Sequence, residues 1–159
     1  MSIVSLGLRS TAKPSSSCFK NHLEPFANPQ EALKNCHQLI GSDDWERQVE
    51  GIQDIVRLIE HHPEVLQTDL HNVNLALLKQ AKNLRSQVSR ASIQAITKLF
   101  DTMKRNMEPD VDRIANLLLH RTADTNKFLQ LDSHYALDAI VENISPTKAV
   151  PAIIQEGLG

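Results

Sequence analysis

The stretch GIQDIVRLI, residues 51–59, decides the fold, because its pattern returns twice further along the chain. Residues 91–99 read ASIQAITKL, and residues 136–144 read ALDAIVENI. Each copy starts with a small residue and places apolar residues four, five and eight positions later, a spacing that lies on one face of an α-helix. The copies begin 40 and 45 positions apart. The pattern therefore predicts one kind of helix, repeated along the chain.

Each copy belongs to a longer helical pattern, and another helical pattern precedes each of them. We expect seven helices with short connections, at residues 29–40, 43–62, 71–83, 84–106, 108–121, 126–144 and 145–158. A period of about 40 to 47 residues built from two helices is typical of HEAT and armadillo repeats, whose hairpins stack because none covers its own apolar face. The sequence thus predicts an all-α fold, a HEAT/armadillo-like α-solenoid of about three and a half repeats.

Composition agrees with one helical domain and sets its limits. The 159 residues are 41% hydrophobic but only 4% aromatic, with 5 glycines, which favours helices over sheet. We expect the HEAT-repeat domain to span residues 29–159 and to be truncated, because the last helix has no partner. Residues 1–28 are Ser-rich, without an acid before Glu24, and are expected to form a flexible tail. A transit peptide is the less favoured alternative. The apolar run IVSLGL is too short for a membrane span.

Motifs of catalysis and of metal binding do not occur in the sequence. There is no H-E-x-x-H, no Cys/His ligand spacing and no glycine-rich phosphate loop. Asp43 and Asp44 stand at a helix start, where they complement the helix dipole. Cys18 and Cys36 indicate reduced thiols in the cytoplasm. We expect no enzyme, no cofactor and no metal.

Local charge is more informative than the net charge of −2, which favours neither nucleic acid nor a membrane as partner. Residues 70–100 contain five Lys or Arg and no acid, whereas residues 43–54 contain five acids. The basic segment and the acidic segment could be two solvated helical faces that partly neutralise each other. Alternatively, Lys82 and Arg85 in the turn of the second hairpin make one edge of the stack positive and suited to an acidic protein. Nucleic acid is disfavoured because this turn lacks aromatic residues.

Trp45 is the only tryptophan, and it stands in the charged stretch GSDDWERQ, residues 41–48. With Val49, Ile52, Val56 and Ile59 it forms one helical stripe, which indicates a core residue. At the first turn of its helix, however, the side chain could overhang the end of the hairpin and be displayed. Val88 poses the same ambiguity in the second hairpin.

Two segments in equivalent places resemble TOG domains of microtubule regulators, of the CLASP and crescerin type. These are SDDWERQVEGI, residues 42–52, and NLRSQVSRASI, residues 83–93; the resemblance covers residues 29–158. TOG domains bind αβ-tubulin through the loops inside each repeat. The resemblance implies tubulin contacts by Trp45 in the first loop, by Lys82, Arg85 and Val88 in the second, and by Lys127 in the third. Phe128 beside it could be a contact or core.

The chain departs from the TOG pattern in length, because such domains usually have six repeats. The resemblance then implies contact mainly with the β subunit of tubulin. The expected function is regulation of microtubule dynamics or organisation without catalysis, in the cytoplasm, the cytoskeleton or the cilium. The alternative is a HEAT scaffold for a partner other than tubulin, with Trp45 in its core.

Overall fold

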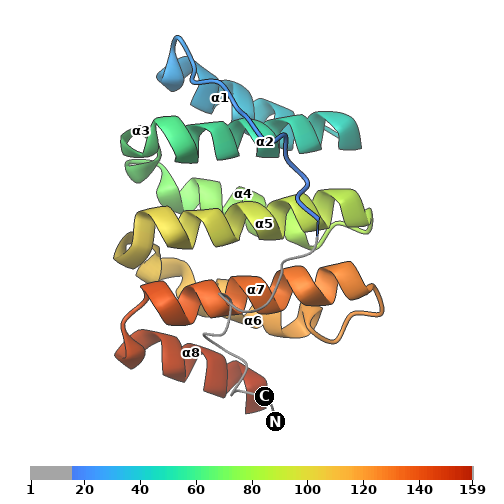
Figure 1. Ribbon diagram of the computed structural model, residues 1–159, viewed down its shortest axis with the longest axis vertical. Helices are drawn as coiled ribbons and strands as arrows, with labels where there is room; N and C mark the ends of the chain where they lie inside the picture. The colour runs from blue at the N-terminus through green and yellow to red at the C-terminus, as the bar shows by residue number, and fades with distance from the viewer. Residues whose placement is uncertain (1–15, 159) are drawn as a thin grey trace.

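A computed structural model describes residues 16–158, and among these residues all regular structure is helical (Figure 1). The expected all-α fold is confirmed. In chain order the elements are α1 (Pro29–Ile40), α2 (Trp45–His61), α3 (Pro63–Gln67), α4 (Leu70–Ala81), α5 (Ser86–Met103), the 3-10 helix η2 (Lys104–Asp110), α6 (Val111–Arg121), α7 (Lys127–Asn143) and α8 (Pro146–Leu158).

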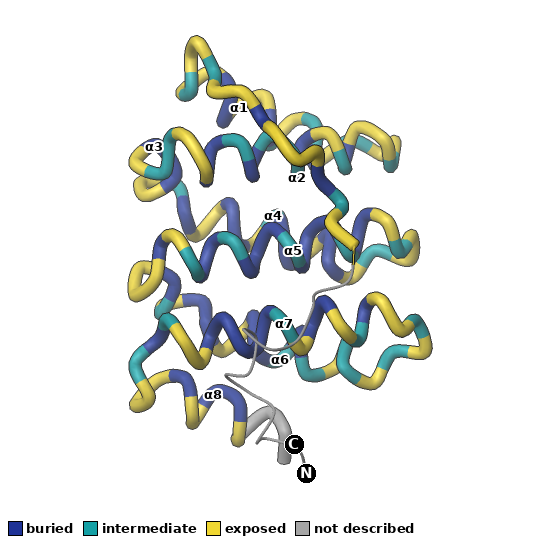
Figure 2. The backbone as a smooth tube through the Cα atoms, in the orientation of Figure 1, coloured by how far each residue is buried: buried dark blue, intermediate teal, exposed yellow. Residues whose placement is uncertain are grey.

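The helices form two layers of a short solenoid. α2, α5 and α7 stack in one layer, and α1, α4 and α6 stack behind them, so that α1–α2, α4–α5 and α6–α7 are hairpins (Figure 1). α8 packs mainly on α6. Buried residues follow the middle of each helix, whereas the turns are largely exposed (Figure 2). The core therefore runs along the stack between the two layers.

The small residue that opens each sequence repeat lies where helices approach closely. A Cβ added to Gly51 would meet Ile40 Cγ1 at 2.8 Å and Leu39 Cβ at 2.9 Å, so a larger residue would push α1 away from α2. Ala91 and Ala136, at the same position of the next repeats, are completely buried. The predicted role of the small residue in admitting a neighbouring helix is confirmed for Gly51 and stays a prediction for Ala91 and Ala136.

Val141 is the one apolar residue of the repeated pattern that the structure leaves exposed. It is 38% exposed, whereas the pattern residues on either side of it, Ile140 in α7 and Ile144 just after it, are buried. α8 covers α6 far more than it covers α7, which leaves this side of α7 open.

Two short elements differ from the seven expected helices. α3 is only five residues long and begins at Pro63, which is well suited to a first helical position, but it is too short to produce a period. η2 replaces the expected ends of two longer helices. It starts at Lys104, whose φ of 51° breaks the α-helix, and it contains Pro109.

Residues 16–28, here called the N-terminal segment, pack against the helices. Phe19 and Leu23 are buried in the core, the Cys18 N–H donates to Gln94 Oε1 at 2.9 Å, and Arg57 Nε donates to the Glu24 carbonyl at 2.9 Å. The flexible tail expected over residues 1–28 does not describe this part, because its few apolar residues meet α2 and α5. Residues 1–15 lie outside the described residues.

No helix within residues 16–158 is both long enough and apolar enough to cross a membrane.

Candidate functional site

The turns inside the three hairpins lie one above another at the right-hand edge of Figure 1. They comprise residues 41–44, 82–85 and 122–126, and we call this surface, together with the first residues of the helices that follow, the turn edge. All five sequence-predicted site residues lie in these turns or in the first turn of the following helix. The solenoid thus brings together residues that are about 80 positions apart in the chain.

Each turn is held by the fourth residue of the helix that follows it. Gln48 Nε2 donates to the Ser42 carbonyl at 2.6 Å, Ser89 Oγ donates to the Ala81 carbonyl at 2.6 Å, and Gln130 Nε2 donates to the Asp124 carbonyl. The Ala81 carbonyl belongs to the end of α4, which leaves it without an intrahelical partner, whereas the Ser42 and Asp124 carbonyls belong to the turns themselves. The three turns therefore share one local construction.

Hydrogen bonds also tie each turn to the next. Asn83 Nδ2 donates to Gln48 Oε1 at 3.2 Å, which joins the first and second turns. The guanidinium of Arg121 donates to the Ala81 carbonyl from Nε at 3.1 Å and from Nη2 at 2.8 Å, which joins the second turn to the end of α6. The turn edge is a connected surface whose side chains are presented at fixed spacing.

Trp45 combines the two alternatives that the sequence left open. It is the first residue of α2, it packs against the core, and it remains half-buried, whereas Ile52 and Val56 further along its stripe are completely buried. The Arg85 guanidinium lies over the indole, with Cζ 4.4 Å from the ring centroid. A cation over an indole contributes about 0.5–1 kcal/mol at an exposed site. The second turn thus fixes the orientation of Trp45 in the first.

The second turn displays Lys82, Leu84 and Arg85, all of which are exposed. Val88 does not lie on this surface: it is 0% exposed, because the third residue of α5 points into the core with the stripe that continues through Ala95. The fully exposed apolar side chain is Leu84 instead. Sequence reasoning missed it, although a leucine between Asn83 and Arg85 in a turn has no helical stripe to join.

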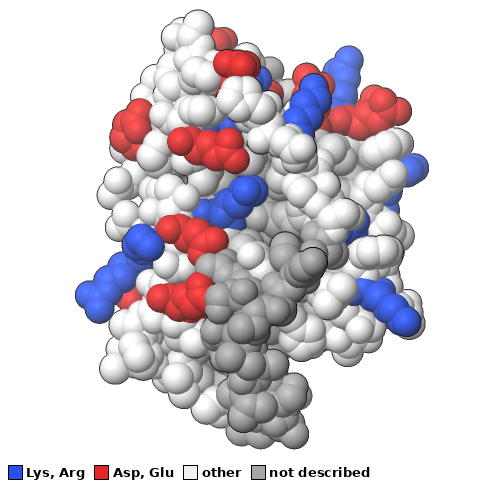
Figure 3. Space-filling view, viewed as in Figure 1, with Lys and Arg blue, Asp and Glu red and all other residues white. Residues whose placement is uncertain are grey.

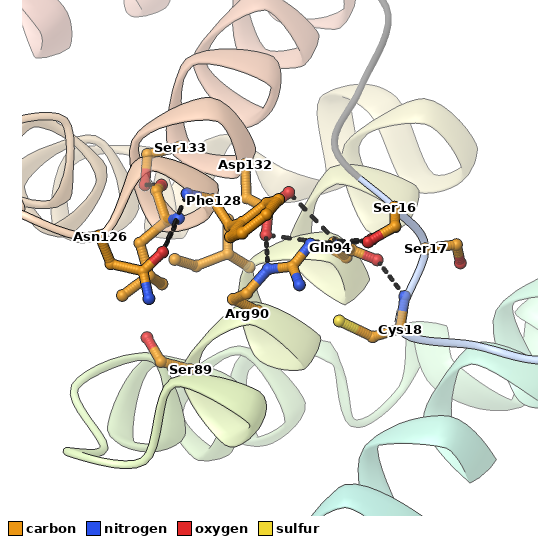
Figure 4. Close-up of polar contacts among 12 residues, drawn as sticks. Ser16, Ser17, Cys18, Ser89, Arg90, Gln94, Asn126, Phe128, Asp132 and Ser133 are labelled. Atoms are coloured by element: carbon orange, nitrogen blue, oxygen red, sulfur yellow. Dashed lines mark hydrogen bonds and ion pairs between the residues drawn. The ribbon is translucent and has the colours of Figure 1, made fainter.

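The third turn displays Lys127 and Phe128, the first two residues of α7. Phe128 is 52% exposed, so the structure places it on the surface and not in the core. The guanidinium of Arg90 lies beneath its ring, with Cζ 4.9 Å from the ring centroid (Figure 4). Phe128 and Trp45 are therefore each paired with an arginine from α5 or the turn before it.

Arg90 has a structural role beneath this surface. Its Nε donates to Asp132 Oδ2 at 2.9 Å, in a pair whose carboxylate is buried and whose guanidinium is largely buried, and its Nη2 donates to the Ser16 carbonyl at 2.8 Å (Figure 4). A buried charge needs such a partner, because an unpaired one would be strongly destabilising. Arg90 therefore supports Phe128 from below and contributes no free positive charge.

The charge of the turn edge changes from one turn to the next. The first turn is acidic, with Asp43, Asp44 and Glu46 exposed, and the second is basic. At the third, Arg121 forms an ion pair with Asp124 at 2.9 Å. The backbone N–H of Asn126 and the Arg121 side chain hold the pKa of Asp124 below its usual value. Figure 3 shows acidic and basic side chains together at the upper right-hand edge and basic ones below.

The side chains of the turn edge are suited to noncovalent binding of a partner. It presents a half-buried indole, two exposed apolar side chains and exposed cations on a hydrogen-bonded base. Within residues 16–158, no group of three or more His, Cys, Asp or Glu side chains is placed to hold a metal ion.

Comparison with known proteins identifies the family of this arrangement. A family model described as CLASP N terminal matches residues 41–158, most of the chain. The chain belongs to the CLASP N-terminal family. The match starts at Gly41, the first residue of the first turn, so the matched residues of this chain include the entire turn edge.

Similar proteins include regulators of microtubules. TOG array regulator of axonemal microtubules protein 1 from human is 38% identical over 137 residues, which cover 86% of this chain and 8% of the relative. The mouse protein of the same name is 36% identical over 135 residues, 85% of this chain and 8% of the relative. Crescerin-like protein che-12 from Caenorhabditis elegans is 31% identical over 128 residues, 80% of this chain and 10% of the relative. The chain spans a tenth or less of the length of these relatives.

Proposed function

We propose that this chain is a tubulin-binding, TOG-type module that regulates microtubule dynamics or organisation without catalysis. The turn edge carries the proposal, because successive turns present Trp45, Leu84 and Phe128 on a common rigid base. Aromatic and arginine side chains are enriched at the centres of protein interfaces, and tryptophan and arginine are among the residues that contribute most of the binding energy. The proposed contact residues are Trp45, Lys82, Leu84, Arg85, Lys127 and Phe128.

The positive charge of the turn edge and the similarity to known proteins both support tubulin as the partner. The cations of the second and third turns suit an acidic protein surface, and such charges mainly raise association rates and specificity. The human and mouse relatives are named as regulators of axonemal microtubules. The proposal therefore extends to the β subunit as the main contact and to the cytoplasm, the cytoskeleton and the cilium as places of action. Its structural unit is residues 16–158, since the N-terminal segment packs on the helices.

Size-exclusion chromatography with unpolymerised αβ-tubulin tests the proposal. We expect the native chain to co-elute with tubulin and the Leu84→Glu/Arg85→Glu variant to elute separately, because the substitutions remove an anchor and reverse a charge. Both side chains are exposed, so the fold is expected to remain intact. Loss of even 1.4 kcal/mol weakens binding about tenfold.

The control variant replaces Lys34 and Arg105 by glutamate, a change of net charge larger than that in the Leu84→Glu/Arg85→Glu variant. Both are exposed and lie away from the turn edge, on α1 and η2. This control should co-elute like the native chain, and circular dichroism should be alike in all three proteins. If the native chain does not bind tubulin at micromolar concentrations, the proposed function is wrong. If all three proteins bind equally, tubulin binding holds but the turn edge is the wrong site.

A further inference from the structure

A groove of about 720 Å³ lies between α4 and α6, on the outer face of the layer that these helices form. Its apolar lining comes from Leu75, Leu78 and Leu117, and its basic lining includes Lys79, Lys82 and Arg113. The α4 residues follow one stripe at spacings of three and four, as do Arg113 and Leu117 on α6. The groove is therefore lined by one face of each of two parallel helices, which belong to successive hairpins.

The floor and the rim of the groove differ in character. Leu78 and Leu117 are largely buried, and Leu75 is 37% exposed, which makes an apolar floor that solvent still reaches. Lys79 and Arg113 are exposed on opposite helices, so a positive charge stands on each side of this floor. A ligand that lies in the groove would meet apolar surface below and cations at both flanks.

No carboxylate lines the groove. Within residues 16–158, neither Lys79, Lys82 nor Arg113 forms an ion pair with Asp or Glu. The nearby Asp110, just before α6, is already bonded to His71 Nδ1 at 2.8 Å and to Asn74 Nδ2 at 3.0 Å. The positive charge of the rim is thus not neutralised by the protein itself.

We propose that this groove binds an acidic peptide segment that carries leucine-like side chains. Its carboxylates would meet the rim and its apolar side chains the floor, and the volume lies within the range of about 300–1,000 Å³ that is usual for binding pockets. Nucleic acid fits less well, because no Phe, Tyr or Trp lines the groove for base stacking. The chain's own first residues do not complement it, since their charged residues are Arg9 and Lys13. The site is separate from the proposed tubulin contacts, apart from Lys82.

Fluorescence anisotropy with a short fluorescein-labelled peptide tests this inference. The probe contains glutamates and places leucines at helical spacing; a second probe has serine in place of each leucine. We expect saturable binding of the leucine probe and at least tenfold weaker binding of the serine probe. The Lys79→Glu/Arg113→Glu variant should bind the leucine probe at least tenfold more weakly than the native chain. Lys82 is left unchanged because it also belongs to the turn edge.

The control variant Lys34→Glu/Arg105→Glu has the same change of charge away from the groove and should bind the leucine probe like the native chain. Equal weakening in both variants would show a general charge effect and overturn the site. Absence of saturable binding, or equal binding of both probes, would overturn the proposed ligand class. So would tighter binding of a labelled single-stranded DNA than of the leucine probe.

Discussion

Gly51 shows how one missing methyl group fixes the distance between two helices. Alanine has the higher helix propensity, by about 1 kcal/mol, but its Cβ would lie 2.8 Å from Ile40 Cγ1 and 3.0 Å from the Ile40 backbone nitrogen. Overpacking of this kind costs about 1–3 kcal/mol. We therefore expect Gly51→Ala to lower the free energy of unfolding by up to about 2 kcal/mol, measured by urea denaturation. Glu50→Ala, on the exposed side of the same helix, should change it little. A more stable Gly51→Ala protein would mean that α1 has room to move.

Cys36 gives the protein a specific sensitivity to alkaline pH. Burial, together with the nearby Asp54 carboxylate, raises the pKa of its thiol from 9.0 to about 12. The folded protein therefore holds this proton more tightly than the unfolded chain does. The contribution to stability is complete below pH 9 and is lost as pH rises from 9 towards 12. The free energy of unfolding, measured by urea denaturation near neutral pH and above pH 9, should fall more for the native protein than for Cys36→Ala. Equal decreases in the two proteins would contradict a raised pKa of the Cys36 thiol.

Trp45 and Val88 illustrate, at the level of the helix, what sequence spacing can predict. Both align with the apolar stripe of their helix, and spacing alone cannot separate them. Their position in the helix does: Trp45 is the first residue of α2 and is half-buried, whereas Val88 is the third residue of α5 and is completely buried. Periodicity predicts burial least well at helix ends, because an apolar stripe does not show where the neighbouring helix ends and stops covering it.

The repeated helices were predictable because three copies of one pattern reinforce each other. The short elements were not: α3 and η2 are five and seven residues long, which leaves no room for a period. The connections between turns, such as that of Asn83 with Gln48, depend on tertiary contacts between side chains that are 35 positions apart. The place of the candidate site and its exposed cations were predictable, while the exposure of Leu84 and the burial of Val88 required the structure.

The N-terminal segment contributes to the stability of the whole molecule. Phe19 and Leu23 are buried against the helices, and replacing a buried leucine or phenylalanine by alanine costs about 2–5 kcal/mol. Since these residues lie at the margin of the core, we expect Phe19→Ala and Leu23→Ala each to lower the free energy of unfolding by about 2–3 kcal/mol. Thermal denaturation followed by circular dichroism measures the effect. Lys20→Ala, at an exposed position of the same segment, is the control. If all three variants matched the native protein, the segment would not be part of the fold.

The same segment changes how the solenoid should fold. In an ordinary repeat array each unit touches only its neighbours, so one end can unravel while the other stays folded. Here the Ser16 carbonyl accepts hydrogen bonds from Arg90 and Gln94, 74 and 78 residues away, and Arg90 continues to Asp132 on α7. These contacts join the N-terminal segment to the second hairpin and, through Arg90, to the third. Unravelling of the N-terminal end would therefore also break contacts with residues 74 and 78 positions away, and contacts between residues so far apart in the sequence favour slower folding.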